Sequence, residues 1–411
     1  MRNGSLRMGL RAIMACTGLA LAFLCIVRVH SAQAEFAAND VRVGDAGTGY
    51  FSVEISPSMK YLSWQEVAGG NLSWQEMFNG VPRGTWIASL DPDTADLAPA
   101  DGKGTSIANI RISGAPQWGV DRRGEFLIAI DAEGRLLQIR PTGASTVETT
   151  VIPLPADSSR RFPYASRLPG RDHAYVVFMQ NDAQRRPQIM MVDLAAPSAL
   201  RQVTSGPTDR NGRMPTFVIT VYRWFEGLPI FTYGFNGAGG KIQMKEVDAS
   251  SPSLDMRVVT TGGFDHVDDF PFVMNGEKHL LGGVDSKARG ALHRFNRSSG
   301  QYETVKTIEP VGTQHRDPQM VASLEPFQFK GQSYATFIVL DGGRGPSNYP
   351  GEVWMTGLGP AGKAWRINGP ERLNRMDPEV FVGRSKAWVF YYARTPDKAN
   401  FELRRAETGL R

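Results

Sequence analysis

Several charged side chains stand beside prolines that open hydrophobic segments. The candidates for catalysis are Asp317, Asp377 and Glu379, with His315 close to the first of them. Two carboxyl groups that face each other can act as general acid and base on a glycosidic bond. A histidine beside an anionic sugar can instead remove an α-proton in a lyase reaction. Both chemistries stay open from the sequence.

A second set of residues at comparable positions would bind a ligand. It combines arginines with a histidine and an aspartate: Arg161, Arg213, His266, Asp269, Arg316 and Arg375. The planar guanidinium group suits carboxylate, sulfate and phosphate groups, so the set predicts an anion-binding site. The alternative is mutual neutralisation, because an aspartate before a proline can cap its turn or pair with a neighbouring arginine. The spacing matches no metal motif, so we expect neither metal nor cofactor.

These residues recur where a repeated segment begins, with a strand, a tight turn and a hydrophobic second strand. The seven copies open at Tyr50, Pro116, Pro163, Pro215, Pro271, Pro318 and Pro378. A third strand follows each pair, as in GRLLQIR and GEVWMTGL, and a more polar fourth strand generally comes next, as in ETTVIP. Four antiparallel strands in a repeat of about 40 to 50 residues are typical of propeller blades.

The sequence therefore predicts an all-β protein, a single β-propeller over residues 35–411 with seven four-stranded blades. Six or eight blades stay within the range of the pattern, because the copy at Tyr50 lacks the proline. The last copy has only three strands, and the segment NDVRVGD near the start of the chain offers a fourth. Pairing of Val41 to Val43 with Phe401 to Arg405 would close the ring without a free strand edge.

The first 34 residues have the three parts of a signal peptide. Arg2, Arg7 and Arg11 precede an apolar run from Ile13 to Val27, and Ala32-Gln33-Ala34 supplies small residues for cleavage. The run is shorter than the about 20 residues that span a membrane. We therefore expect cleavage after Ala34 and a periplasmic or secreted mature protein, no longer attached to the membrane.

Removal of this leader changes the charge balance. Its four arginines reduce the 46 basic residues to 42, against 41 acidic ones. An almost neutral mature chain gives no reason to expect nucleic acid or a membrane surface as a partner. Cys16 and Cys25 also leave with the leader, so the mature chain has no disulfide; a lipid on Cys16 is the alternative. We expect a monomer.

The pentapeptide LSWQE occurs twice, at Leu62 to Glu66 and at Leu72 to Glu76. The segment AGGN between the copies is a good turn, which predicts a hairpin that extends the first blade outward. The alternative is that Trp64 and Trp74 are exposed and stack on sugar rings.

Propeller geometry would bring the charged residues together. The innermost strand of each blade starts at the face where the loop from the previous blade arrives. Residues at the opening prolines would therefore ring one mouth of the central channel, and the sequence predicts the functional site there.

Two further stretches carry a resemblance to known families. RQVTSGPTDRNGRMPTF, Arg201 to Phe217, resembles the repeats of TolB-like exported bacterial propellers. RMDPEVFVGRSKAWVFYYAR and HRDPQM resemble the Asp-Pro strand openings of arabinanase- and invertase-type glycoside hydrolase propellers. In those hydrolases such an aspartate can be the catalytic base, a role that the resemblance implies for Asp377 or Asp317. They have five blades, however, and this chain has no matching Glu-Gly-Pro segment for their acid.

Two functions follow from these observations. The first is an exported propeller that binds a small anionic ligand, an oligosaccharide or a partner protein at the channel mouth. The second is a glycan-active enzyme, a hydrolase or lyase, that uses the Asp-Pro carboxylates.

Overall fold

The computed structural model describes residues 40–44, 49–67, 82–98, 105–107, 110, 116–143, 146–204, 223–236, 241–260, 264–266, 269–283, 285, 289–310, 318–341, 351–394 and 401–411. The leader predicted over residues 1–34 and the second LSWQE copy lie outside these ranges. Within them, no helix has the length and hydrophobicity that a membrane crossing requires.

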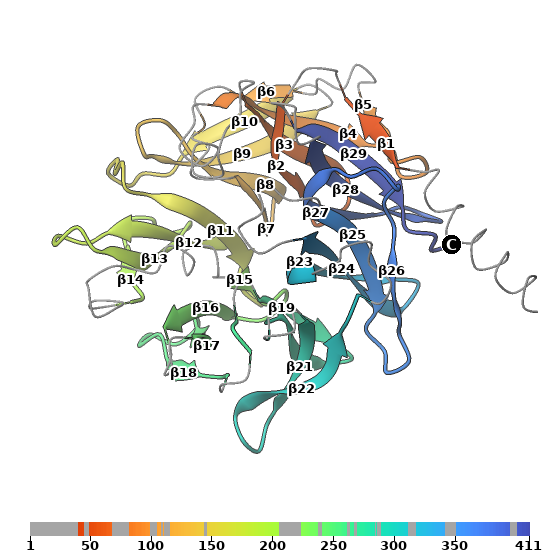
Figure 1. Cartoon of the computed structure of the whole chain (residues 1–411). Coiled ribbons are helices and arrows are strands. Elements are labelled where there is room, and N and C mark those ends of the chain that lie inside the picture. Colours follow the sequence, from red (N-terminus) through yellow and green to blue (C-terminus); the bar gives the residue numbers. More distant parts are fainter. Residues whose placement is uncertain are drawn as a thin grey trace, which may run out of the picture.

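The described strands form seven antiparallel sheets arranged in a ring (Figure 1). The first blade contains β2 (Gly49–Ile55), β3 (Tyr61–Val67), β4 (Pro82–Leu90), β5 (Leu97–Ala98) and β6 (Thr105–Ile107), and the second contains β7 (Gln117–Asp121), β8 (Gly124–Ile130), β9 (Leu136–Gly143) and β10 (Thr146–Val151). The third blade contains β11 (Arg161–Arg167), β12 (Ala174–Asn181), β13 (Pro187–Asp193) and β14 (Arg201–Gln202), and the fourth contains β15 (Arg223–Trp224), β16 (Ile230–Asn236), β17 (Ile242–Asp248) and β18 (Met256–Val258). The fifth blade contains β19 (Phe270–Met274), β20 (Glu277–Gly282), β21 (Gly290–Asn296) and β22 (Gln301–Ile308). The sixth contains β23 (Pro318–Phe329), β24 (Gln332–Asp341), β25 (Gly351–Gly357) and β26 (Ala364–Arg366). The seventh contains β27 (Asn374–Val382), β28 (Ala387–Arg394), β29 (Glu402–Glu407) and β1 (Val41–Val43).

This arrangement confirms the predicted all-β propeller with seven blades. Six of the described sheets have four strands, and in the first blade the short strands β5 and β6 both pair with β4. The innermost strands are β2, β7, β11, β15, β19, β23 and β27, each hydrogen-bonded on one side only.

The N-terminal strand closes the ring as predicted. In β1, Val41 pairs with Arg405 and Val43 with Leu403 of β29, so that β1 becomes the outer strand of the seventh blade. The pairing covers the edge of β29 and gives the seventh blade its fourth strand.

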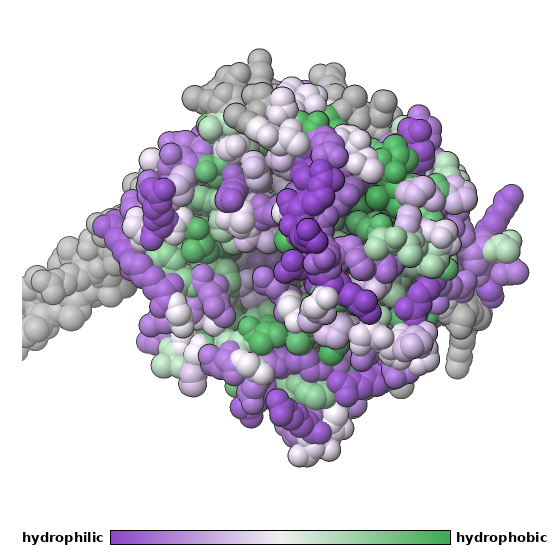
Figure 2. All heavy atoms as spheres, turned by 180° about the vertical axis from the view of Figure 1, so that it is seen from behind, coloured by the Kyte–Doolittle hydropathy of each residue, from purple (hydrophilic) through white to green (hydrophobic). Residues whose placement is uncertain are grey.

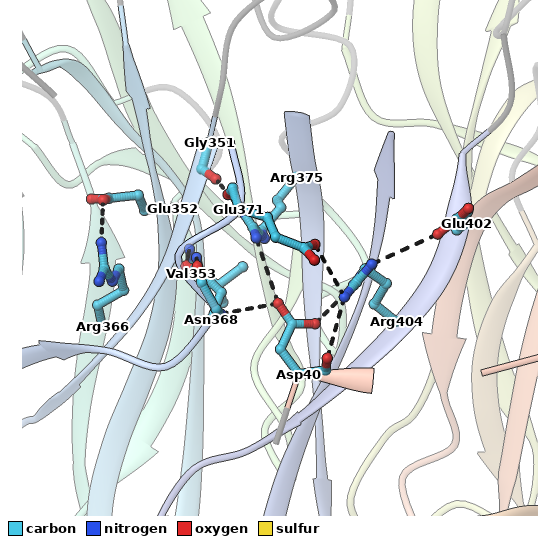
Figure 3. A network of polar contacts seen from close by, with 11 residues as sticks. Asp40, Gly351, Glu352, Val353, Arg366, Asn368, Glu371, Arg375, Glu402 and Arg404 are labelled. Atoms are coloured by element: carbon cyan, nitrogen blue, oxygen red, sulfur yellow. Dashed lines mark hydrogen bonds and ion pairs between the residues drawn. The ribbon is translucent and has the colours of Figure 1, made fainter. Parts of the chain in front are cut away.

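Asp40, directly before β1, fastens this closure (Figure 3). Its buried carboxylate accepts hydrogen bonds from Arg404 Nε at 2.8 Å and from the Gly369 backbone N–H at 3.0 Å, and Arg375 Nη2 lies 3.5 Å away. Burial alone would raise the pKa of Asp40, but the nearby Tyr391 hydroxyl, the hydrogen bond from Arg404 and the charges of Arg404 and Arg375 hold that pKa below its usual value. The carboxylate therefore stays ionised inside the protein.

The hydrophobic core consists of seven apolar clusters, one at each contact between neighbouring blades. The strand β28 shows why the second strands are so hydrophobic. Trp388 and Phe390 pack against the first blade, whereas Val389 and Tyr391 pack against the sixth. Because both faces of the strand are covered, all eight of its residues are buried and no alternation of polar and apolar residues is seen.

The predicted LSWQE hairpin is wrong, because both edges of the first copy are already paired. Strand β3 lies between β2 and β4, with Trp64 opposite Trp86. The side chain of Trp64 is only 2% exposed and its ring stacks on Trp86 at 6.5 Å. The alternative of an exposed Trp64 that stacks on sugars is therefore also wrong, and Trp74 lies outside the described residues.

Candidate functional site

The described residues line a central cavity of about 860 Å³. The innermost strand of every blade contributes to it, through Glu54, Gln117, Tyr164, Arg223, Phe270, Glu325 and Glu379 among others. Figure 2 shows one face of the ring, where hydrophilic residues surround a hollow near the centre. A concave site that collects side chains from all blades is the usual place for a propeller ligand.

The cavity follows the inner strands as far as the turns at their ends. Its lining includes Pro57 and Met59 in the turn after β2, and Glu226 and Gly227 in the turn after β15. We call this side of the ring the hairpin face, because the turn between the first and second strand of each blade lies there. The lining of the cavity also includes Pro271, one of the opening prolines, and Gln117, Tyr164 and Glu379, which directly follow three others.

A repeated irregularity in the inner strands directs side chains into this cavity. Ser52, Phe162, Ser323 and Asp377 all have positive φ values between 49° and 57°. At each of them the register of the inner strand shifts against its neighbour, which is a β-bulge. Two residues later come the cavity-lining residues Glu54, Tyr164, Glu325 and Glu379. Bulges re-aim side chains, and non-glycine residues with positive φ cost about 1–3 kcal/mol each, so such bulges are typical of functional sites.

The bulges also correct the alignment of the sixth and seventh blades. The sequence repeat places Pro318 opposite Pro378, and hence Asp317 opposite Asp377. In the structure, the bulge puts Ser323 in the place of Asp377, so that Leu324, six residues after Pro318, matches Pro378. The counterpart of Glu379 is therefore Glu325, and Asp317 is not the counterpart of Asp377.

Two of the cavity glutamates have strongly perturbed acidity. Burial raises the pKa of Glu54 well above its usual value, with a further increase from the negative charge of Asp377. Burial also raises the pKa of Glu379, and the charges of Glu54, Glu325 and Asp377 add to the effect. Like charges in one low-dielectric site cannot all ionise at neutral pH, so the group retains a proton.

Hydrogen bonding distinguishes these two glutamates. Gln117 Nε2 donates a hydrogen bond of 2.5 Å to Glu54 Oε1, which lowers the pKa of Glu54 against the burial effect. No hydrogen bond between described residues acts on Glu379 in this way. Gln117 thus favours the ionised form of Glu54, whereas Glu379 has no such donor among the described residues.

The opposite side of the cavity carries a cation and aromatic rings. Arg223 of the fourth blade lies 3.6 Å from Glu325 of the sixth blade and stacks over the ring of Phe270, with 4.6 Å between its guanidinium carbon and the ring centroid. Burial raises the pKa of Tyr164 to about 12, so its hydroxyl stays protonated and can donate a hydrogen bond. Glutamates thus line the cavity along blades six, seven and one, with Glu226 on blade four, and the two lining arginines, Arg167 and Arg223, belong to blades three and four.

The structure brings only part of the predicted site together. Glu379 lines the cavity, and Asp377 is near enough for its charge to raise the pKa values of Glu54 and Glu379. Arg161 begins β11 with an exposed side chain. Four further candidates lie outside the described residues: Arg213, His315, Arg316 and Asp317.

Arg375 has a place in the ring closure. Its side chain is 1% exposed and donates hydrogen bonds to the carbonyl oxygens of Gly351 at 3.0 Å and Glu371 at 3.1 Å, in addition to its contact with Asp40 (Figure 3). A side chain enclosed in this way holds the blade together and does not line the central cavity.

His266 and Asp269 form a buried pair away from the central cavity. His266 Nδ1 lies 2.6 Å from Asp269 Oδ2, and the ring of His293 is 5.1 Å from that of His266. The Gly283 backbone N–H donates to the other oxygen of Asp269 at 2.8 Å. Within the described ranges, no group of three or more His, Cys, Asp or Glu residues is arranged to hold a metal ion.

His293 should make the protein less stable in acid. Burial lowers the pKa of His293 to about 4, and the positive charge on His266 acts in the same direction against the charge of Asp269. The unfolded chain would bind this proton near pH 6.5. Between these values the unfolded state takes up more protons, so the free energy of unfolding should decrease by about 3 kcal/mol as the pH falls from 6.5 to 4.

The measurement is urea unfolding of wild type and of His293→Gln across this pH range. Groups away from this cluster titrate equally in both proteins, so the difference in slope reports His293 and its interaction with His266 and Asp269. Parallel stability curves would contradict the prediction.

Sequence reasoning missed Glu54, Glu325, Arg223, Gln117 and Tyr164. The sequence does contain a signal for Glu54 and Glu325. It is a tripeptide of a serine or aspartate, an apolar residue and a glutamate, which occurs as Ser-Val-Glu at 52–54, Ser-Leu-Glu at 323–325 and Asp-Pro-Glu at 377–379. Only the third tripeptide contains a proline, so the pattern of opening prolines does not mark the first two.

The comparisons with known proteins concern the fold alone. No family model matches the sequence, and no curated protein matches it. Among solved structures, Trypanosoma rangeli sialidase in complex with sialic acid is 11% identical, with a TM-score of 0.43 over 90% of this chain and 57% of that one. A puromycin hydrolase mutant is 14% identical, with a TM-score of 0.42 over 73% of this chain and 44% of that one. An oligogalacturonate lyase in complex with manganese is 10% identical, with a TM-score of 0.49 over 90% of this chain and 96% of that one. The chain thus spans about half the length of the first two.

Proposed function

We propose that this propeller is a glycan-active enzyme that cleaves an oligosaccharide in its central cavity by acid–base catalysis. The observation that carries the proposal is the pair Glu54 and Glu379, two cavity carboxyl groups with raised pKa values and different hydrogen bonding. A protonated and an ionised carboxyl group in one site are the parts that glycosidic cleavage needs.

The roles follow from the environments. Glu379, which keeps its proton, donates it to the oxygen of the leaving sugar. Glu54, which Gln117 stabilises as a carboxylate, assists the attack at the other side of the bond, either through a water molecule or directly. Tyr164 and Arg223 line the same cavity and can orient sugar hydroxyl groups by donating hydrogen bonds.

The balance of charge supports a neutral substrate over an anionic one at this face. Four glutamates line the cavity, Glu54, Glu226, Glu325 and Glu379, against two arginines, Arg167 and Arg223, and Arg223 lies beside Glu325. An anion would have to enter near these carboxyl groups and would be repelled wherever they ionise. The anion-binding mouth predicted at the opening prolines remains a prediction, since Arg213, His315 and Arg316 lie outside the described residues.

The test is a screen of the purified mature protein against neutral and anionic oligosaccharides. We expect release of new reducing ends from at least one neutral oligosaccharide and a thermal shift with the same compound. Thermal shifts with anionic compounds alone, without product, would support the binding function instead. No product and no shift with any compound would contradict both functions.

A further inference from the structure

A second cavity of about 680 Å³ lies between the fifth and sixth blades. It continues the central cavity along the hairpin face. Ser333, at the start of β24, lines both cavities, and the neighbouring residues Val273 and Met274 line the central and the second cavity respectively. We call the second cavity the side groove. A ligand that extends out of the centre toward these blades would enter it.

Two tight hairpin turns form one end of the side groove. Asn275 and Gly276 have φ values of 54° and 75°, and Lys330 and Gly331 have values of 47° and 75°. Positive φ at both central residues is the mark of a type I′ turn, which connects two strands with the fewest residues. A Cβ atom at Gly276 or Gly331 would meet nothing within 4 Å, so the space beside both turns is open.

Lys306 holds the opposite wall of the side groove in place. Its ammonium group donates hydrogen bonds to three carbonyl oxygens in the turn between β25 and β26: Gly357 at 2.6 Å, Gly359 at 2.9 Å and Gly362 at 2.8 Å. Lys306 belongs to the fifth blade and the turn to the sixth. This contact ties one wall of the groove across the blade boundary, and a wall that is already ordered lowers the cost of binding a ligand.

The lining of the side groove combines aromatic rings with polar side chains. Tyr334 and Trp365, both half-buried, meet edge to face with 6.5 Å between ring centroids. Arg294 and Gln332 lie at exposed positions in the same lining. Aromatic surface with a few hydrogen-bonding groups suits a sugar ring, which has apolar C–H faces and a polar edge.

We propose that the side groove binds further sugar units of the oligosaccharide whose bond is cleaved in the central cavity. This inference rests on the proposed function and adds that the substrate is an extended and uncharged chain. The charged groups among the described lining residues favour this: Lys306 is satisfied by three carbonyl groups, and Arg294 lies 3.8 Å from Glu277. A chain longer than the central cavity would then bind more tightly than a short one.

The test measures how affinity depends on chain length. Oligosaccharides from disaccharide to hexasaccharide, of the linkage that wild type cleaves, are titrated calorimetrically into Glu379→Gln, which prevents turnover. We expect affinity to increase by about tenfold from the shortest to the longest chain, which corresponds to 1.4 kcal/mol. Addition of Ala361→Trp, which fills the side groove at an exposed turn position, should remove this increase and leave disaccharide affinity unchanged.

Ala195→Trp is the matched control, because it occupies the corresponding turn between β13 and β14 of the third blade. Lys306→Met is a second groove variant, and should also reduce the preference for long chains by loosening the turn. If the affinity of both groove variants depended on chain length as strongly as that of the parent protein, the proposal that the side groove binds sugar units would be overturned. Failure of the proposed function is recognised separately, since wild type would then release no product from chains of any length.

Discussion

Glu379→Gln should lower kcat on an oligosaccharide by about 10²- to 10⁴-fold, the usual contribution of a positioned general acid. The amide has nearly the shape of the carboxyl group but cannot supply its proton. Because the substitution leaves the cavity wall intact, KM should change little. The measurement is steady-state kinetics on the best substrate from the screen. Glu303→Gln, an exposed glutamate of β22, is the matched control and should retain wild-type kinetics.

Substrates with different leaving groups distinguish the role of Glu379, the proposed general acid, from that of Glu54. A nitrophenyl glycoside has a leaving group that departs without protonation, so Glu379→Gln should lose much less activity on it than on the natural bond. Glu54→Gln should lose activity on both, because attack at the sugar carbon is impaired whatever the leaving group is. Equal losses of Glu379→Gln on both substrates would remove Glu379 from the role of acid.

Gln117 provides a pH-dependent check on the same assignment. The hydrogen bond from Gln117 favours the ionised form of Glu54, so its removal in Gln117→Leu should raise the pKa of Glu54 further. Activity requires this carboxylate. The acidic limb of the kcat/KM profile should therefore move to higher pH, while the basic limb, set by loss of the proton from Glu379, should move much less. An unmoved acidic limb would mean that another group carries the base.

The propeller could be predicted because its signal is repeated. Each blade must bury its second strand on both faces, and the uninterrupted run from Trp388 to Tyr392 records this requirement directly in the sequence. The closing strand could be predicted for a similar reason. The last repeat has three strands and needs a fourth, and Val41 to Val43 have the sequence pattern of a strand. Both are properties of local sequence combined with a known architecture.

The site depends on details that local sequence does not carry. Whether a side chain faces the channel depends on a bulge in which Ser52 or Ser323 takes a positive φ, and serine gives no particular signal for that conformation. A proline marks the bulge at Asp377 but not at Ser323, and the Asp-Pro pair six residues earlier in the sixth blade gave a false match. One such shift exchanges the residues on the two faces of a strand.

The ring itself creates the remaining part of the site. Glu54 and Glu379 are far apart in the sequence and meet because the last blade closes against the first. Their shared proton follows from this proximity and from burial, neither of which is visible in composition. Arg375, which the sequence analysis predicted to bind a ligand, instead stabilises the same closure by donating hydrogen bonds to backbone carbonyl groups.

Asp40→Ala should destabilise the protein by about 3–5 kcal/mol, the usual cost of removing one partner from a buried ion pair. The substitution leaves Arg375, which is 1% exposed, without the carboxylate beside it, and removes the acceptor of the hydrogen bonds from Arg404 Nε and from the Gly369 N–H. It also loosens β1, the strand that covers the edge of β29. The measurement is the free energy of unfolding from urea denaturation at neutral pH.

Asp96→Ala supplies the matched control for this closure. Asp96 pairs with Arg405, the neighbour of Arg404 in β29, at 2.9 Å, but its side chain is 65% exposed. An exposed pair of this kind contributes about 0–1 kcal/mol, because water and salt screen it. Asp40→Ala should therefore cost several times as much as Asp96→Ala although both remove an aspartate that contacts the same strand. Equal effects would mean that the buried network does not fasten the ring, and that the backbone pairing of β1 with β29 closes it alone.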